Sequence, residues 1–248
     1  MCVRYVLYRS DAALASISRA LACRLAPPEW AKPRYNVTVT DVMPVVAASP
    51  AGPEVRGMMW GCVPPHERSK PKMRMWPNAK AETAPATGLW KAGAARRRCL
   101  VPADGFYEWQ TVGRLKRPYY FTLRGEEPFA FAGLWEEAEG NVPETFAILT
   151  TCPNSLVASI HHRMPVILTP GAMPRWLGSE PLPEEDYRAL IQPLPAHHMA
   201  ARPVDPYVNR CGNEGPRCLA PAGESQPEFA LGDWHPNVSP KRHSDPSL

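Results

Sequence analysis

The sequence contains residues whose types could do chemistry: Cys2, Glu108, and the adjacent His161 and His162. Removal of Met1 would leave Cys2 with a free α-amine and a thiol on adjacent carbons. Reference pKa values of about 7.7–8.0 for the amine and about 8.5 for the thiol leave both groups partly nucleophilic near neutral pH. Such an amine condenses with an aldehyde to an imine, and the thiol can close on the imine carbon to form a thiazolidine ring. The alternative is that Cys2 is only an incidental second residue.

Glu108 and one of the adjacent histidines, His161 or His162, are candidates for proton transfer. Glu108 lies in the apolar, aromatic run 105–109, where desolvation would raise the pKa of its carboxyl and suit it to acid–base work near neutral pH. A buried glutamate with a structural partner is the alternative. His161, next to His162, falls between an expected helix and an expected strand, where an imidazole can reach a pocket. Ordinary surface exposure is the alternative for one of two adjacent histidines.

A basic, loop-rich segment at 64–98 surrounds Asn78, with Trp60, Trp76 and Trp90 in or beside it. Basic residues with nearby aromatic rings suit a phosphate backbone and unstacked bases. A solvated loop whose tryptophans face the core fits the composition equally well. The net charge of +4 permits a polyanionic partner without requiring one.

Short strands and short helices must position these residues. The β-prone segment 2–8 would place Cys2 at the start of a strand. Ser10 or Asp11 would then cap a helix, with residues 14, 17, 21 and 25 on its buried face, that ends at the prolines 27–28. Further strands are expected at 33–37, 55–63, 99–109 with a turn at 104–105, and 166–168. Residues 117–124, 128–135 and 144–151 are expected to form the strands of a β-meander. Further helices are expected at 154–160, 170–177 and 183–191. This order predicts an α+β fold rather than a doubly wound sheet.

Composition limits the class of protein. There are 31 prolines among 248 residues, which favours short elements and ordered loops over a helical bundle. Seven scattered cysteines without a C-x-x-C pair suggest neither a metal site nor a disulfide framework, and no cofactor is indicated. No stretch is typical of a secretion signal or a membrane span, so we expect a cytoplasmic protein with reduced thiols and no membrane partner. Residues 1–210 are expected to form one domain and 211–248 a mobile tail.

Together these stretches resemble the SOS-response-associated peptidase (SRAP) family of abasic-site-processing proteins. The resemblance rests on Met1-Cys2 with Arg4-Tyr5, and on the runs 33–36, 60–64, 78–83, 98–109, 134–136, 150–151, 161–165 and 208–209, which occur in the family's order over roughly residues 2–210. It implies a mixed, mainly antiparallel, barrel-like β core with short helices around it.

The resemblance also implies a covalent reaction with DNA. The amine and thiol of Cys2 would trap the aldehyde of an abasic site in single-stranded DNA as a thiazolidine. Asn78 would hydrogen-bond the sugar-derived part, while Glu108 and His161 would move protons. DNA-binding residues implied in the same way are Arg4, Asn36, Trp60, Lys80 and Arg163, with Trp60 stacking on bases and the cations on phosphates. A monomer is favoured.

Three departures from the family pattern affect fit and rate. Val3 stands where the family usually has glycine, residues 38–40 are Thr-Val-Thr instead of Ala-Pro-Thr, and Lys80 replaces the commoner arginine. A cysteine peptidase that uses Cys2, His161 and Glu108, and a non-covalent reader of damaged DNA, are the alternative functions. A chain that retains Met1 cannot perform the aldehyde chemistry, because its α-amine is not on Cys2.

Overall fold

The computed structural model describes residues 3–64, 67–68, 70, 73–178 and 180–223, so Cys2 lies outside the described residues. The strands are β1 (Arg4–Leu7), β2 (Arg34–Thr38), β3 (Val42–Ser49), β4 (Gly52–Trp60), β5 (Asn78–Lys80), β6 (Arg98–Ala103), β7 (Gly105–Val112), β8 (Leu115–Leu123), β9 (Phe129–Glu136), β10 (Thr145–Thr151), β11 (Met164–Pro165), β12 (Ile167–Leu168) and β13 (Met199–Pro203). The α-helices are α1 (Ser10–Leu21), α2 (Lys91–Arg96), α3 (Ser155–Ala158), α4 (Met173–Leu177) and α5 (Glu184–Leu190). Short 3₁₀ turns are η2 (Ala84–Ala86), η3 (Pro170–Ala172), η4 (Ala196–His198), η5 (Pro206–Asn209) and η6 (Pro216–Leu219).

Two sheets organise the described part of the chain. The smaller sheet has the strand order β13-β8-β7-β1-β2, and its pairs are antiparallel. In the larger sheet, β10, β4, β3, β6 and β9 pair in sequence, and β9 also pairs with β10, which closes these strands into a ring. The pairs of β10 with β4 and with β5 are parallel, so this sheet is mixed. The expected α+β fold with a barrel-like, mainly antiparallel core is confirmed.

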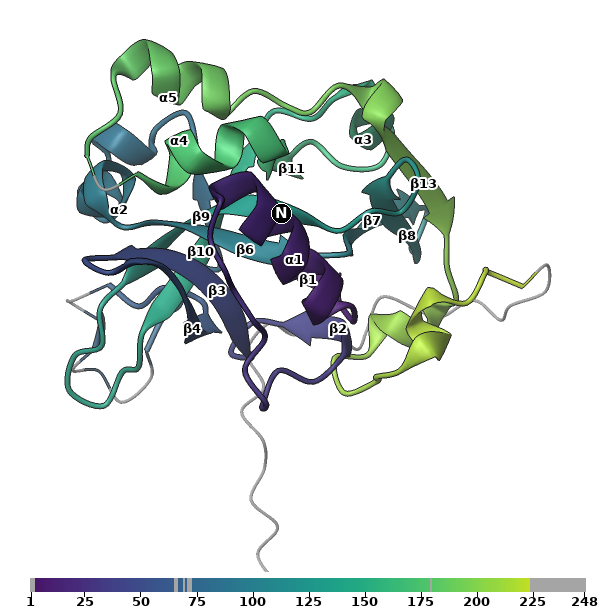
Figure 1. The fold of residues 1–248 in the computed structure, drawn as a ribbon. Helices are drawn as coiled ribbons and strands as arrows, with labels where there is room; N and C mark the ends of the chain where they lie inside the picture. The colour runs from purple at the N-terminus through teal and green to yellow at the C-terminus, as the bar shows by residue number, and fades with distance from the viewer. Residues whose placement is uncertain (1–2, 65–66, 69, 71–72, 179, 224–248) are drawn as a thin grey trace, which may run out of the picture.

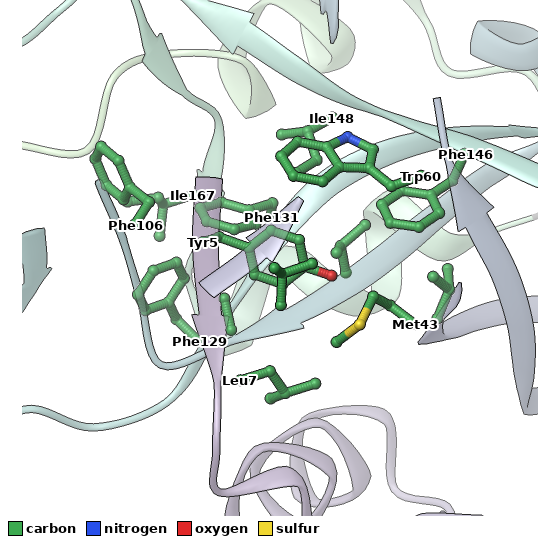
Figure 2. Packing of buried hydrophobic residues seen from close by; sticks show 14 of the residues in the cluster. Tyr5, Leu7, Met43, Trp60, Phe106, Phe129, Phe131, Phe146, Ile148 and Ile167 are labelled. Atoms are coloured by element: carbon green, nitrogen blue, oxygen red, sulfur yellow. The ribbon is translucent and has the colours of Figure 1, made fainter. Parts of the chain in front are cut away.

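The core lies inside the ring and against the inner face of the smaller sheet. Figure 2 shows its aromatic centre, where Tyr5 of β1 meets Trp60 of β4 and Phe131 of β9. The Tyr5 ring lies edge-on to both, at centroid distances of 5.2 and 5.9 Å. Helices α1, α2 and α4 pack on β6, and α1 and α2 also contact β9, so that they cover the outside of the ring (Figure 1). Apolar burial on this scale is the main force that holds the two sheets together.

The chain passes from the larger to the smaller sheet at Asp104, between β6 and β7. The Asp104 carboxylate is fully buried and accepts hydrogen bonds from the backbone amides of Tyr8 and Arg9 and from the Arg9 guanidinium. At Gly105 a Cβ atom would lie 2.4 Å from the Tyr120 ring, so only glycine allows this close approach. The segment expected as a strand with a turn at 104–105 is therefore two strands in two sheets.

Three further expectations differ from the structure. The strands at 115–151 do not form a meander, because β8 pairs with β7 and β13 whereas β9 pairs with β6, β10 and β12. Helix α1 ends at Leu21 rather than at the prolines, because Ala22 adopts a left-handed conformation with φ of 50°. Strands β3, β5, β11 and β13 are additional to those expected, and β5 lies in the segment that was expected to be a loop.

Residues 211–223, expected to be part of a mobile tail, pack on the smaller sheet. Turn η6 buries Cys218 completely, and Val204 bridges to Pro221. The rest of that expected tail, 224–248, lies outside the described residues. None of the helices in the described ranges is long and apolar enough to cross a membrane.

Candidate functional site

Glu108 and His161 meet where the two sheets adjoin. Glu108 is on β7 of the smaller sheet, and His161 is in the turn between α3 and β11, next to the larger sheet. The distance from Glu108 Oε1 to His161 Nδ1 is 3.7 Å, which is too long for a hydrogen bond but close enough for the two charges to interact. Glu108 is 3% exposed, and its Oε1 accepts no hydrogen bond from any described residue. This arrangement leaves a carboxyl oxygen available for a ligand's proton.

The two groups have altered acidity for the same physical reason. Burial raises the pKa of Glu108 to about 7, although the Trp109 backbone amide partly offsets it. Burial also lowers the pKa of His161 below its usual value. The carboxyl can therefore donate or accept a proton near neutral pH, and the imidazole is mainly neutral there. The environment that the sequence predicts for Glu108 is present.

The His161 ring is fixed by the backbone of Arg163. Its Nδ1 lies 2.9 Å from the Arg163 carbonyl oxygen and 3.1 Å from the Arg163 backbone nitrogen. Nδ1 donates to the carbonyl in one tautomer and accepts from the amide in the other. The ring is thus held in one place for either protonation state of Nδ1, as a proton-transfer residue requires.

Strand β5 brings Asn78 and Lys80 to the end of β10. The parallel register pairs Asn78 with Ile148 and Lys80 with Thr150. Asn78 is 6% exposed, whereas Lys80 is exposed. The Trp60 indole donates a 2.9 Å hydrogen bond to the carbonyl of Pro77 and so holds the start of this strand. Strand β5 therefore carries a buried amide at Asn78 and, two residues later, an exposed ammonium at Lys80.

Arg163 lies at the same strand end. Its guanidinium forms two 2.8 Å hydrogen bonds with the Glu82 carboxylate and also donates to the carbonyl of Thr150. Since Thr150 is the register partner of Lys80, both cations lie beside one residue of β10. The edge of the site near Thr150 is therefore basic, with Glu82 as its carboxylate partner.

The register of β1 directs the N-terminus toward Glu108. Tyr5 pairs with Phe106 and Val6 with Gly105 in an antiparallel ladder. Continuing that register by two residues sets Val3 opposite Glu108. Paired residues on neighbouring strands project to the same face, so this position shares the face of Tyr5 and Phe106. The predicted nucleophile, Cys2, precedes Val3 in the chain and is outside the described residues.

Arg4 and Asn36 project to the opposite face of the smaller sheet. Arg4 is 2% exposed and donates to the Asn36 side-chain oxygen at 2.8 Å and to the carbonyl of Val208 at 3.0 Å. Asn36 is fully buried and donates to the carbonyls of Arg210 and Asn213. We call these residues, Arg4 and Asn36 with 208–213, the C-terminal clasp. In this conformation the clasp residues Arg4 and Asn36 join β1 and β2 to the C-terminal segment.

The structure thus brings together some of the expected site residues and separates others. Glu108 and His161 adjoin each other. Asn78 and Lys80 on β5, together with Arg163, lie along β10. Trp60 is fully buried, with its ring 6.3 Å from that of Phe146 in a stacked arrangement (Figure 2), so it has no face open to a base.

The basic segment 64–98 is less available for DNA than its composition suggests. Arg98 is buried and bonds to backbone carbonyls, and Arg97 pairs with Glu136. Trp90 is 6% exposed. Trp76 stays partly exposed and carries Arg74 on its ring face at 5.3 Å. Trp60, Trp90 and Arg98 therefore have interior roles, whereas the other described cations stay at least partly at the surface, with Lys70, Arg74, Lys80, Lys91 and Arg96 exposed.

Glu82 and Thr150 are site residues to which the sequence reasoning gave no role. Both lie in runs that carry the family resemblance, 78–83 and 150–151. Only the fold reveals that they are partners of Arg163, because Thr150 is 13 residues and Glu82 is 81 residues away from it in the sequence. No group of three or more His, Cys, Asp or Glu side chains in the described ranges is arranged to hold a metal ion.

The fold and the site define an α+β protein with a buried glutamate beside a histidine, and a basic edge, near its N-terminal strand. The family SOS response associated peptidase (SRAP) matches residues 1–211, and the chain belongs to this family.

Similar proteins carry a common description. Abasic site processing protein YoqW of Bacillus subtilis (strain 168) is 34% identical over 191 residues, which cover 75% of this chain and 85% of the relative. Abasic site processing protein HMCES of Gallus gallus is 30% identical over 238 residues, covering 80% of this chain and 70% of that protein. A crystal structure of a protein from Bacteroides thetaiotaomicron superimposes with a TM-score of 0.75 at 26% identity, covering 89% of this chain and all of the other.

Proposed function

We propose that this protein captures abasic sites in single-stranded DNA by forming a covalent thiazolidine through Cys2 after removal of Met1. The observation that supports this most strongly is the Glu108–His161 pair, which lies beside the strand that leads to Cys2. Family membership and the names of the relatives support the same substrate. We expect the protein to act as a cytoplasmic monomer, on DNA, and without a metal or cofactor.

The reaction needs proton transfers but no oxidant. The Cys2 amine adds to the C1 aldehyde of the ring-opened deoxyribose, and the carbinolamine loses water to give an imine. The thiol sulfur then adds to the imine carbon, and its proton goes to the imine nitrogen. One C–N and one C–S bond form, and one water leaves.

Glu108 and His161 suit the acid–base steps. With a pKa of about 7, Glu108 can accept a proton from the Cys2 ammonium and return it to the departing hydroxyl. His161, mainly neutral at that pH, can take the proton of the sugar hydroxyl during ring opening. Asn78, which is almost fully buried beside β10, would hydrogen-bond the sugar-derived part of the adduct.

Lys80 and Arg163 are the described cations best placed for the phosphates on either side of the lesion. Such contacts carry little sequence information, so the selectivity would be for the lesion and for an unpaired strand. We keep Arg4, Asn36 and Trp60 as DNA-binding residues only in a conformation that opens the clasp or the core. The conformation described gives them no surface for DNA.

The test is a denaturing gel with Met1-processed protein and a single-stranded oligonucleotide that carries one abasic site. We expect a denaturant-resistant shifted band with wild type, none with Cys2→Ala, and none on an intact oligonucleotide. Glu108→Gln and His161→Gln should slow adduct formation by roughly 10²-fold or more, the usual contribution of a general acid or base. Absence of the band with correctly processed wild type would exclude this function.

A cysteine peptidase is the second candidate, because the family description includes that activity and Cys2, His161 and Glu108 are the residue types it uses. Cleavage of a peptide substrate that is lost in Cys2→Ala, without any DNA adduct, would favour it. DNA affinity that is unchanged in Cys2→Ala, again without an adduct, would favour the non-covalent reader.

A further inference from the structure

The guanidinium of Arg163 is already occupied by an anion from its own chain. Nη1 and Nη2 each donate to one oxygen of the Glu82 carboxylate at 2.8 Å. Nη2 also donates to the carbonyl of Thr150 and lies 3.4 Å from its hydroxyl. This fork-to-fork geometry is the one that arginine also uses to bind a phosphate. A phosphate and the Glu82 carboxylate would therefore need the same donors.

The two side chains differ in how deeply they lie. The Arg163 side chain is 16% exposed, whereas that of Glu82 is 42% exposed. Glu82 lies in the turn between β5 and η2, on the solvent side of the guanidinium. Rotation of the carboxylate into solvent would also release the backbone amides of Glu82 and Cys152, which donate to it, and would uncover the fork. The bonds to Thr150 would keep Arg163 in place. The carboxylate is thus the replaceable partner and the guanidinium is the fixed one.

Glu82 is charged when DNA would bind. Partial burial raises the pKa of Glu82, but the hydrogen bonds and charge of Arg163, together with hydrogen bonds from the backbone of Glu82 and Cys152, outweigh this effect and hold the pKa below its usual value. The carboxylate is therefore an anion at neutral pH. It cancels much of the attraction that Arg163 would have for a second anion, and Lys80, two residues earlier, remains the exposed cation of this edge.

We propose that Glu82 is a built-in competitor of DNA at Arg163: a backbone phosphate must displace its carboxylate to reach the guanidinium. This inference rests on the proposed function, because it takes single-stranded DNA as the ligand of this edge. Its consequence is weak reversible binding to intact strands, so that retention on DNA depends on the covalent step at a lesion. Glu82 acts on affinity and not on the bond-forming chemistry.

The test is equilibrium binding of a fluorescein-labelled, intact single-stranded oligonucleotide, measured by fluorescence anisotropy at low salt. Removal of the competing charge in Glu82→Gln should tighten binding about five- to tenfold. The same substitution should give no gain in an Arg163→Gln background, where there is no fork to release. Glu54→Gln is the matched control: Glu54 also pairs with an arginine and is 46% exposed, but it lies on the β3–β4 hairpin. It should change affinity less than about twofold, although it alters the net charge equally.

Three results would overturn the inference. Weaker or unchanged binding by Glu82→Gln would mean that Glu82 positions Arg163 or has no role. A gain that persists without Arg163 would mean a general charge effect. Absence of measurable binding by both wild type and Glu82→Gln would also contradict it. Glu82→Asp keeps the charge but shortens the side chain, so it should increase the affinity for DNA less than Glu82→Gln does. It provides the test if Glu82→Gln does not fold. The readout uses intact DNA, so it is independent of whether the abasic-site adduct forms.

Discussion

Glu108 combines deep burial with a carboxyl oxygen that no described residue bonds. An ordinary structural glutamate at 3% exposure would be paired, because an unpaired buried carboxylate is costly. In Glu108 this cost is reduced because the carboxyl, with its pKa raised to about 7, keeps its proton at lower pH. A group that is half protonated at working pH is useful to a reaction that needs an acid and a base in turn.

This raised pKa predicts a particular dependence of stability on pH. The folded-state pKa of Glu108 is raised from 4.5 to about 7, so the folded state holds the proton more tightly than the unfolded chain. Its contribution to stability is full below about pH 4.5 and is lost as pH rises to about 7. The loss is on the order of 3 kcal/mol.

Glu108→Gln removes the ionisation while keeping the shape. Urea unfolding of both proteins from pH 4 to 8 should show the unfolding free energy of wild type falling relative to that of Glu108→Gln across this window. A difference between the two proteins that does not change with pH would contradict the assignment.

At the residue scale, sequence reasoning succeeded where local context decides the environment. The aromatic run 105–109 was enough to predict that Glu108 is buried. It failed to place Arg4 and Trp60 because side chains alternate along a strand: Arg4 faces away from Glu108, and Trp60 faces into the ring of strands. A positive charge or an indole in a sequence does not reveal which face it takes.

The C-terminal clasp is the element that fixes the start of β1. Arg4 bonds to Asn36 and to the backbone at Val208 and Asn209, and it lies 5.7 Å from the centre of the Trp109 ring. The indole of Trp109 in turn donates to the Asn209 side chain at 2.7 Å. Through these bonds the last described segment limits where β1 can lie along β7.

Asn36→Ala should therefore destabilise the fold by about 2–4 kcal/mol, because it leaves the Arg4 guanidinium and two backbone carbonyls short of partners. The exposed Asn141→Ala is the control and should change stability by less than about 0.5 kcal/mol. Urea unfolding measures both. Equal effects of the two substitutions would show that the clasp contributes no stability.

At the element scale, most strands were predictable and their partners were not. Each run of β-prone residues at 115–151 is a strand, but sequence order suggested a meander because consecutive strands usually pair. The turn at 104–105 is where the chain changes sheets, and its cause is tertiary: a buried Asp104 and a Gly105 pressed against Tyr120. The ordered residues 211–223 were missed for a related reason, since a short irregular segment has no periodicity to detect.

For the whole molecule, Glu108 and His161 lie at the junction of two sheets, with cations at the nearby end of β10. Binding to a single strand through phosphates should weaken with salt, with a slope of about −0.7 in log–log form for each contacted phosphate. Lys80→Gln should reduce the magnitude of this slope by about 0.7, because the exposed ammonium would lose its phosphate. Lys32→Gln, an exposed lysine ahead of β2, is the control. Anisotropy titrations at several salt concentrations provide the slopes, and equal slopes for Lys80→Gln and wild type would contradict the contact.

The central claim is that the amine and thiol of Cys2 together capture an abasic aldehyde. The most direct measurement is the intact mass of the adduct between Met1-processed protein and an abasic single-stranded oligonucleotide, isolated without a reducing agent. We expect the summed masses of protein and DNA minus one water, and a Cys2 thiol that no longer reacts with an alkylating reagent. An adduct of this mass in which Cys2 remains alkylatable, or no adduct at all, would contradict the account.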